Sequence, residues 1–162
     1  MDMRLTYSDN KLKLLIFILV MITLLKISHA TETPYNSRYV VITHADTKNK
    51  TLSISELQGI YGLKIKAWDD KTPITIFSTN PLNQEHHNFC KRVLGVFAHQ
   101  LQRAWDRLTY SGRAISPTIV SSFEEMRDAV AKTPGSIGYI PQNELTSIVY
   151  KVKIISGDDH EG

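Results

Sequence analysis

Histidines are the side chains of this 162-residue chain that most readily suggest metal chemistry. His86 and His87 are neighbours, and adjacent residues of a helix point about 100° apart, so they make a poor chelating pair. His44 and His99 stand elsewhere in the chain without a ligand-like spacing. His86 shares a predicted apolar helix face with Leu82, Phe89 and Val93, which favours a packed histidine over a metal ligand.

No sequence pattern supports nucleophilic or acid–base catalysis. The chain has no glycine-rich phosphate loop, no G-x-S-x-G elbow, no H-E-x-x-H helix and no paired-carboxylate arrangement. Cys90 is the only cysteine, so a disulfide within the chain is impossible, and we expect this residue to be a small buried apolar side chain. The sequence therefore predicts a protein that is not an enzyme and that uses no metal or cofactor.

A basic–aromatic stretch runs from Arg103 through Trp105 and Arg107 to Arg113, a composition that suits single-stranded nucleic acid. Trp105, however, falls at helical spacing between two leucines, which favours a core position, and the arginines at 103 and 107 then form a solvated face. The formal net charge of the whole chain is only +3. We therefore expect no nucleic-acid partner.

The first 30 residues have the order of features that is typical of a secretory signal peptide. Lys11 and Lys13 precede an apolar run from Leu14 to Leu25, and Ser28-His29-Ala30 supplies small residues around a cleavage site after Ala30. The apolar run has 12 residues, against about 20 needed to span a bilayer. We expect cleavage, a periplasmic location and no membrane span in the mature chain; a retained membrane anchor is the alternative.

Strands and helices alternate along the rest of the chain. Strands are predicted at 38–43, 74–78, 117–120, 136–140 and 147–155. Helices are predicted after Ser53, from a cap at Asn80 to a stop at Gly95, around Trp105, and after Ser122. This pattern predicts an α/β fold, a single domain at 38–155 with a mixed, mostly parallel sheet and helices on both faces. Residues 31–37 are predicted to be a polar leader and 156–162 a disordered tail.

Sheets of this kind bind ligands at the carboxyl ends of their strands, where loops lead into helices. Thr43 and His44 follow the first predicted strand, and a ligand role and ordinary loop polarity are both open for them. Ser122 opens a helix whose first N–H groups could bind an anion. The competing interpretation is that Ser122 and Glu125 only cap that helix.

Several segments have a familiar order and spacing. The most specific are Pro134-Gly-Ser-Ile-Gly-Tyr139, and Gly62-Leu-Lys64 followed by Trp68. Together with Thr72–Phe77, Arg92–Gly95 and Ser122–Met126, the chain over about 38–141 resembles the small phosphate ABC-transporter substrate-binding-like proteins of the type 2 periplasmic-binding superfamily. Members of full length have two lobes that enclose an anion. The matched segments resemble the second lobe, so the resemblance implies a single lobe.

The resemblance also implies a place for the ligand, the turn from Ser78 to Glu85, where the family has a Ser/Gly/Thr-rich turn that opens a helix. Ser78, Thr79, Asn80 and Asn83 are the donors implied there. Thr43 and Ser122, at the strand end and the helix start considered above, complete the set of candidate anion-binding residues. The turn departs from the family pattern, because it has no glycine, Pro81 lacks an N–H, and Glu85 brings negative charge. An ordinary polar cap is the alternative interpretation.

The function that the resemblance implies is an exported solute-binding-like protein. Its ligand would be phosphate or a similar small oxyanion, and its protein partner an ABC permease or an envelope sensor. The alternative is a cell-envelope interaction module that reuses one lobe without tight ligand binding.

Overall fold

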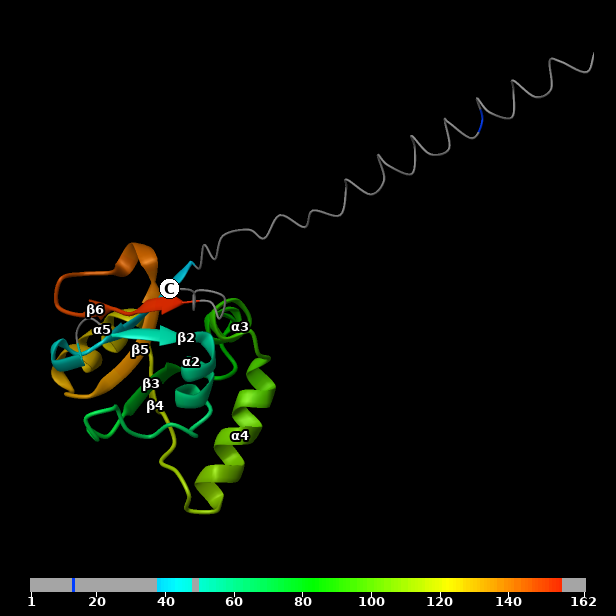
Figure 1. Cartoon of the computed structure of the whole chain (residues 1–162), viewed down its shortest axis with the longest axis horizontal. Helices are drawn as coiled ribbons and strands as arrows, with labels where there is room; N and C mark the ends of the chain where they lie inside the picture. Colours follow the sequence, from blue (N-terminus) through cyan, green and yellow to red (C-terminus); the bar gives the residue numbers. More distant parts are fainter. Residues whose placement is uncertain (1–12, 14–37, 48–49, 156–162) are drawn as a thin grey trace, which may run out of the picture. The chain divides into compact units, whose positions relative to one another are not determined.

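The computed structural model describes residue 13, residues 38–47 and residues 50–155 (Figure 1). The predicted leader and tail, and all of the predicted signal peptide except Lys13, lie outside these residues. None of the helices in the described ranges is long and apolar enough to cross a membrane.

A five-stranded sheet in the order β4-β3-β5-β1-β6 is the centre of the fold. Its parallel strands are β4 (Thr118–Val120), β3 (Thr75–Thr79) and β5 (Ser136–Pro141). The strand β1 (Tyr39–Thr43) runs antiparallel both to β5 and to β6 (Tyr150–Lys151). Thus β1 alone opposes the direction of the other four strands, and the predicted mixed, mostly parallel sheet is confirmed.

The end of the chain differs from the prediction. Residues 147–155 were expected to form one strand, but they form two short strands in different sheets. After β6 the chain leaves the main sheet, and β7 (Lys153–Ile155) pairs in parallel with β2 (Thr51–Ser53), a strand that the sequence did not reveal. The change occurs at Val152, whose N–H donates to Val41, whereas the N–H of Lys153 donates to Lys50. The prediction failed because alternation reports which side chains are buried and does not report which strand the backbone pairs with.

Helices cover both faces of the main sheet. On one face, α5 (Phe123–Lys132) packs so closely on β5 that a side chain at Gly138 would meet Met126 Sδ at 2.8 Å. Tyr139, next in the strand, points to the other face and stacks on Phe89 with ring centroids 3.7 Å apart. That face carries α2 (Ile54–Tyr61), α3 (Gln84–Phe89) and α4 (Ala98–Tyr110), which lie away from α5 in Figure 1.

The helix ends follow local chemistry. Ser53 and Glu56 form the predicted capping box of α2. The π-helical turn η3 (Cys90–Leu94) continues α3, and Gly95, at φ 65°, ends it as predicted. Two short 3-10 turns, η2 (Ala45–Thr47) and η4 (Gln142–Glu144), follow β1 and β5.

The start of α3 was predicted too early. The side chain that caps this helix is Asn83, which accepts from the N–H of Glu85, and not Asn80. Asn80 instead accepts from the N–H of Leu82 in a preceding turn, closed by a bond from the N–H of Asn83 to the carbonyl of Asn80. Leu82 consequently lies outside the helix and is 88% exposed, so it does not share the buried face of His86.

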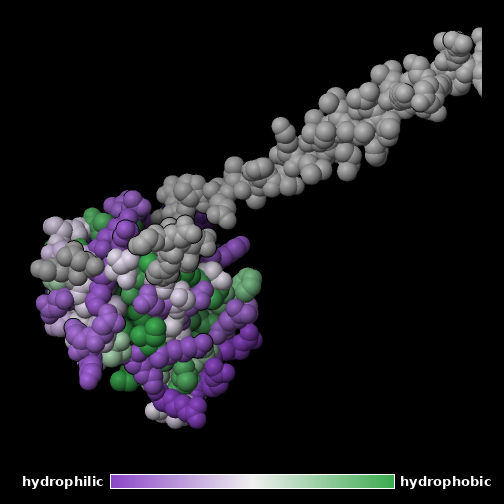
Figure 2. Space-filling view, viewed as in Figure 1, coloured by the Kyte–Doolittle hydropathy of each residue, from purple (hydrophilic) through white to green (hydrophobic). Residues whose placement is uncertain are grey.

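Hydrophobic side chains from both faces of the main sheet, from the helices and from β2 form one core. Trp105 is buried as predicted, and its Nε1 donates to the carbonyl of Tyr61 at 2.6 Å. Arg103 and Arg107 are exposed on the other side of α4, as expected. Hydrophilic residues cover much of the surface in Figure 2, with hydrophobic residues exposed between them.

Candidate functional site

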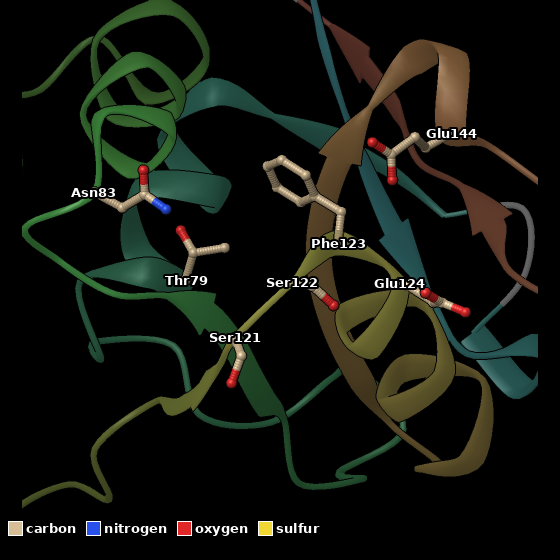
Figure 3. Close-up of a pocket in the computed structure, with 7 residues that line it drawn as sticks. All are labelled: Thr79, Asn83, Ser121, Ser122, Phe123, Glu124 and Glu144. Carbon is tan, nitrogen blue, oxygen red and sulfur yellow. The ribbon is translucent and has the colours of Figure 1, made fainter.

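A pocket of about 330 Å³ opens where the turn after β3 meets the start of α5. Its lining residues come from four parts of the chain: Thr79, Asn83, Ser121, Ser122, Phe123, Glu124 and Glu144. Because β3, β4 and β5 are parallel, the loops after all three strands reach the same edge of the sheet. We call this cavity the α5 pocket (Figure 3).

The start of α5 supplies hydrogen-bond donors to this pocket. Ser122 caps the helix by accepting from the N–H of Glu125 at 3.1 Å, and its hydroxyl proton stays available. The N–H groups of Phe123 and Glu124 have no acceptor among the described residues. These free N–H groups and the positive end of the helix dipole favour a negatively charged or carbonyl-bearing ligand.

Asn83 lies on the opposite wall of the pocket (Figure 3). Its side-chain oxygen is occupied by the N–H of Glu85 at 3.1 Å, which leaves the amide nitrogen as a donor. In Figure 3 that nitrogen points toward Thr79 and the pocket. One side chain therefore both caps α3 and presents a donor to a ligand.

Thr79 is held in place by a buried hydrogen-bond network. Its hydroxyl lies 2.7 Å from the hydroxyl of Tyr139, which lies 3.1 Å from Nδ1 of His86. The same nitrogen is 3.2 Å from the hydroxyl of Ser78, and Nε2 of His86 is 3.3 Å from Sγ of Cys90. Two polar side chains and a thiol thus share one imidazole beneath the pocket, and Thr79 joins this network through Tyr139.

Burial sets the titration of this network. Loss of solvation lowers the pKa of His86 to about 4, so the imidazole is neutral at physiological pH. Burial also raises the pKa of Tyr139, and it raises the pKa of the Cys90 thiol to about 12. Hence Cys90 is a thiol, not a nucleophilic thiolate, and His86 is a packed core histidine as predicted.

Carboxylates are the unexpected part of the pocket. Glu124 and Glu144 line it, and no lysine or arginine does. Figure 3 shows both of these carboxylates on the side of the pocket away from Asn83. Glu85, which the sequence placed beside the ligand, is not a lining residue, because its carboxylate accepts from the hydroxyl of Tyr39. That bond and, above all, loss of solvation raise the pKa of Tyr39 to about 12.

Three of the six residues predicted from the sequence come together here, namely Thr79, Asn83 and Ser122. Ser78 points into the core toward His86, and Asn80 is used in its own turn. Thr43 lies at the other edge of the sheet, because β1 is antiparallel and Thr43 pairs with Ile137 near the start of β5. The expectation that Thr43 ends its strand beside the other loops is therefore wrong.

Sequence reasoning missed four lining residues. Ser121, Phe123 and Glu124 flank Ser122, so the helix start itself could have indicated them. Glu144 belongs to η4, beyond the end of β5, and nothing local in the sequence links it to the turn after β3. Within the described residues, no group of three or more His, Cys, Asp or Glu side chains is arranged to hold a metal ion.

The fold and this pocket define a class of structure, a single α/β lobe with a pocket at the carboxyl ends of its parallel strands. No protein-family model and no curated protein matches the chain. Solved structures do match it. An ABC-type phosphate transport receptor from Vibrio cholerae superposes with a TM-score of 0.56 at 15% identity, over 72% of this chain and 45% of that one.

Two further structures agree. A putative phosphate ABC transporter substrate-binding protein with bound phosphate, from Clostridium perfringens, gives a TM-score of 0.57 at 21% identity over 72% of this chain and 44% of that one. A possible phosphate-binding protein from Planctomyces limnophilus gives a TM-score of 0.56 at 18% identity, over 74% of this chain and 42% of that one. At these identities the comparison establishes the fold. The chain spans less than half the length of these proteins, which agrees with the single lobe that the sequence predicted.

Proposed function

We propose that this chain is an exported solute-binding-like domain that binds a small oxyanion, with phosphate as the leading candidate, in the α5 pocket. The single observation that carries the proposal is the convergence of free donors there: the N–H groups of Phe123 and Glu124, the hydroxyl of Ser122 and the amide nitrogen of Asn83. The likeness to proteins described as phosphate receptors supports the choice of ligand. An ABC permease or an envelope sensor is the proposed recipient of the bound state.

The pocket carboxylates set the expected affinity and selectivity. Glu124 and Glu144 repel a multiply charged anion, and no cation in the lining offsets them, so binding should be weak. Phosphate at neutral pH still carries an O–H group that can donate to a carboxylate. Sulfate carries none and would face both carboxylates as an acceptor only. Phosphate should therefore bind in preference to sulfate.

Calorimetric titration of the purified protein with phosphate and with sulfate at neutral pH tests the proposal. In the variant Asn83→Asp, a carboxylate can still cap α3, but it replaces the donor in the pocket with a charge, so phosphate binding should fall below detection while the fold is kept. Gln84→Glu adds the same charge one residue away, outside the lining, and should keep most of the binding. The proposal is wrong if millimolar phosphate produces no heat with the wild-type protein, or if both variants bind equally.

The second candidate function is a cell-envelope interaction module that does not depend on a bound solute. The acidic lining of the α5 pocket is the observation that favours it. In this case, a protein partner purified from envelope extracts would bind the wild-type chain and Asn83→Asp equally, with or without phosphate. A partner whose binding requires phosphate, and fails with Asn83→Asp, would instead support the first candidate.

A further inference from the structure

A second hollow, of about 440 Å³, lies between the turn that follows β3 and the start of α4. Its apolar lining consists of Pro81, Leu82, Phe97 and Ala98. Leu82 is 88% exposed and Phe97 is 60% exposed, unusual values for two large apolar side chains that face one cavity. We call this hollow the α4 groove. It shares no lining residue with the α5 pocket.

Both exposed apolar residues stand on hydrogen-bonded backbone. Leu82 belongs to the turn that the N–H of Asn83 closes on the carbonyl of Asn80 at 2.8 Å. Phe97 is the cap residue of α4, its carbonyl accepts from Gln100 at 2.9 Å, and its ring stacks on the imidazole of His99. The groove is therefore preformed, which lowers the entropic cost of binding a partner there.

The polar part of the groove is positive or neutral. Lys91, His87, His99 and Gln102 complete the lining, and no carboxylate is among them. The nearest acid in the helix, Asp106, accepts from the side chain of Gln102 at 2.7 Å. The N–H groups of Ala98 and His99 have no acceptor among the described residues, so the positive end of the α4 dipole also faces this groove. The α5 pocket, lined by Glu124 and Glu144, has the opposite character.

From this combination we propose that the α4 groove is a docking site for an acidic peptide segment of a protein partner. A large apolar side chain of the partner fills the hollow between Leu82 and Phe97. Flanking carboxylates of the partner reach Lys91 and the first N–H groups of α4.

Two other occupants fit less well. A second copy of the chain, related by a two-fold axis through the groove, would bring the positive lining against itself. A lipid surface would suit a protruding apolar patch, whereas this one is hollowed to receive a side chain. The proposal concerns a different surface from the α5 pocket, so it stands or falls separately from anion binding.

Fluorescence anisotropy with labelled, end-blocked peptides tests the proposal on the purified protein. The probe is Asp-Glu-Leu-Phe-Glu-Asp, compared with a neutral version in which amides replace every acid and with a version in which serines replace Leu-Phe. The acidic apolar peptide should bind at least ~10-fold more tightly than either control peptide, as expected when charge complementarity and a central apolar anchor act together.

Variants locate the binding. Phe97→Ser should weaken binding of the acidic peptide by ~10-fold or more. The variant should still fold, because serine is a preferred helix cap. Lys91→Gln should weaken binding of the same peptide by roughly 5-fold. Tyr110→Ser removes an aromatic residue at the far end of α4 that is even more exposed than Phe97, 92% against 60%, and it should leave peptide binding unchanged. Phosphate titration of Phe97→Ser should match the wild-type protein, which separates this surface from the α5 pocket.

Four results would overturn the proposal. They are equal binding of the acidic and neutral peptides, no binding at millimolar peptide, binding unchanged in Phe97→Ser, and binding lost equally in Tyr110→Ser. Vesicles of phosphatidylcholine with added phosphatidylserine form a further arm. Vesicle binding that requires Phe97, with no response to the peptides, would identify the groove as a lipid contact and reject the peptide.

Discussion

Two buried tyrosines, Tyr139 and Tyr61, offer a matched test of the hydrogen-bond network beneath the α5 pocket. Both are completely buried in the same aromatic cluster, with ring centroids 6.3 Å apart. The hydroxyl of Tyr139 contacts the hydroxyl and the N–H of Thr79 and Nδ1 of His86. The hydroxyl of Tyr61 has no hydrogen-bond partner among the described residues. The same substitution by phenylalanine should therefore have opposite effects at the two positions.

The expected sizes follow from the partners left behind. Tyr139→Phe leaves the buried hydroxyl of Thr79 without its partner, whereas Nδ1 of His86 keeps the hydroxyl of Ser78, and it should lower the free energy of unfolding by about 2 kcal/mol. Tyr61→Phe removes a buried hydroxyl that is desolvated without compensation and should raise the free energy of unfolding by up to about 1 kcal/mol. The two variants should thus differ by about 3 kcal/mol, although each loses only one oxygen.

Urea unfolding followed by tryptophan fluorescence measures both variants against the wild-type protein. The dependence of the unfolding free energy on urea should stay the same, because the surface exposed on unfolding does not change. A neutral effect of Tyr139→Phe would show that the network does not stabilise the fold. A loss in Tyr61→Phe as large as that in Tyr139→Phe would show that the Tyr61 hydroxyl does have a partner.

The remaining predictions concern pH and one helix end. His86 has a pKa of about 4 in the folded chain, below its ordinary value near 6.5, so the unfolded chain takes up the proton first as pH falls. The free energy of unfolding should therefore decline as the pH falls from about 6.5 to about 4. His86→Gln should flatten this decline, measured by urea unfolding at several pH values. An equally steep decline in that variant would refute the assignment of the pH dependence to His86. Gly95 has φ 65° with open space around its α-carbon, so Gly95→Ala should cost about 1 kcal/mol through the backbone alone. Gly95→Asn should cost less in the same unfolding measurement, since asparagine tolerates this conformation, and equal costs would contradict a backbone origin.

The sequence predicted the four strands of the main sheet whose composition is β-branched and whose ends carry turn residues. It also predicted the capping box at Ser53 and the stop at Gly95, since these depend on neighbours within one turn. It could not choose between Asn80 and Asn83 as the cap of α3, because both are good caps and only the hydrogen bonds of the Asn80 turn decide. It could not divide residues 147–155 either, because the division depends on distant partners in two sheets.

The candidate site shows the same limit. A serine in a strand before a turn looks like a ligand donor, yet Ser78 faces inward, since alternate strand residues take opposite faces and the neighbouring Thr79 takes the pocket. The direction of β1 decided the place of Thr43, and no local pattern reports the direction of a strand. Glu144 could not be predicted for a related reason: it lies in η4, and only the direction of β5 brings η4 to the pocket.

The position of β1 has a consequence for how this chain reaches its native state. The strand β1 sits between β5 and β6, which begin only at Ser136 and Tyr150, far later in the sequence. Until they emerge, β1 can pair with neither neighbour, so folding depends on contacts between distant parts of the sequence and should be slow. A nascent chain truncated before Ser136 would expose an apolar strand on both edges, and such a chain should need a chaperone to stay free of aggregates.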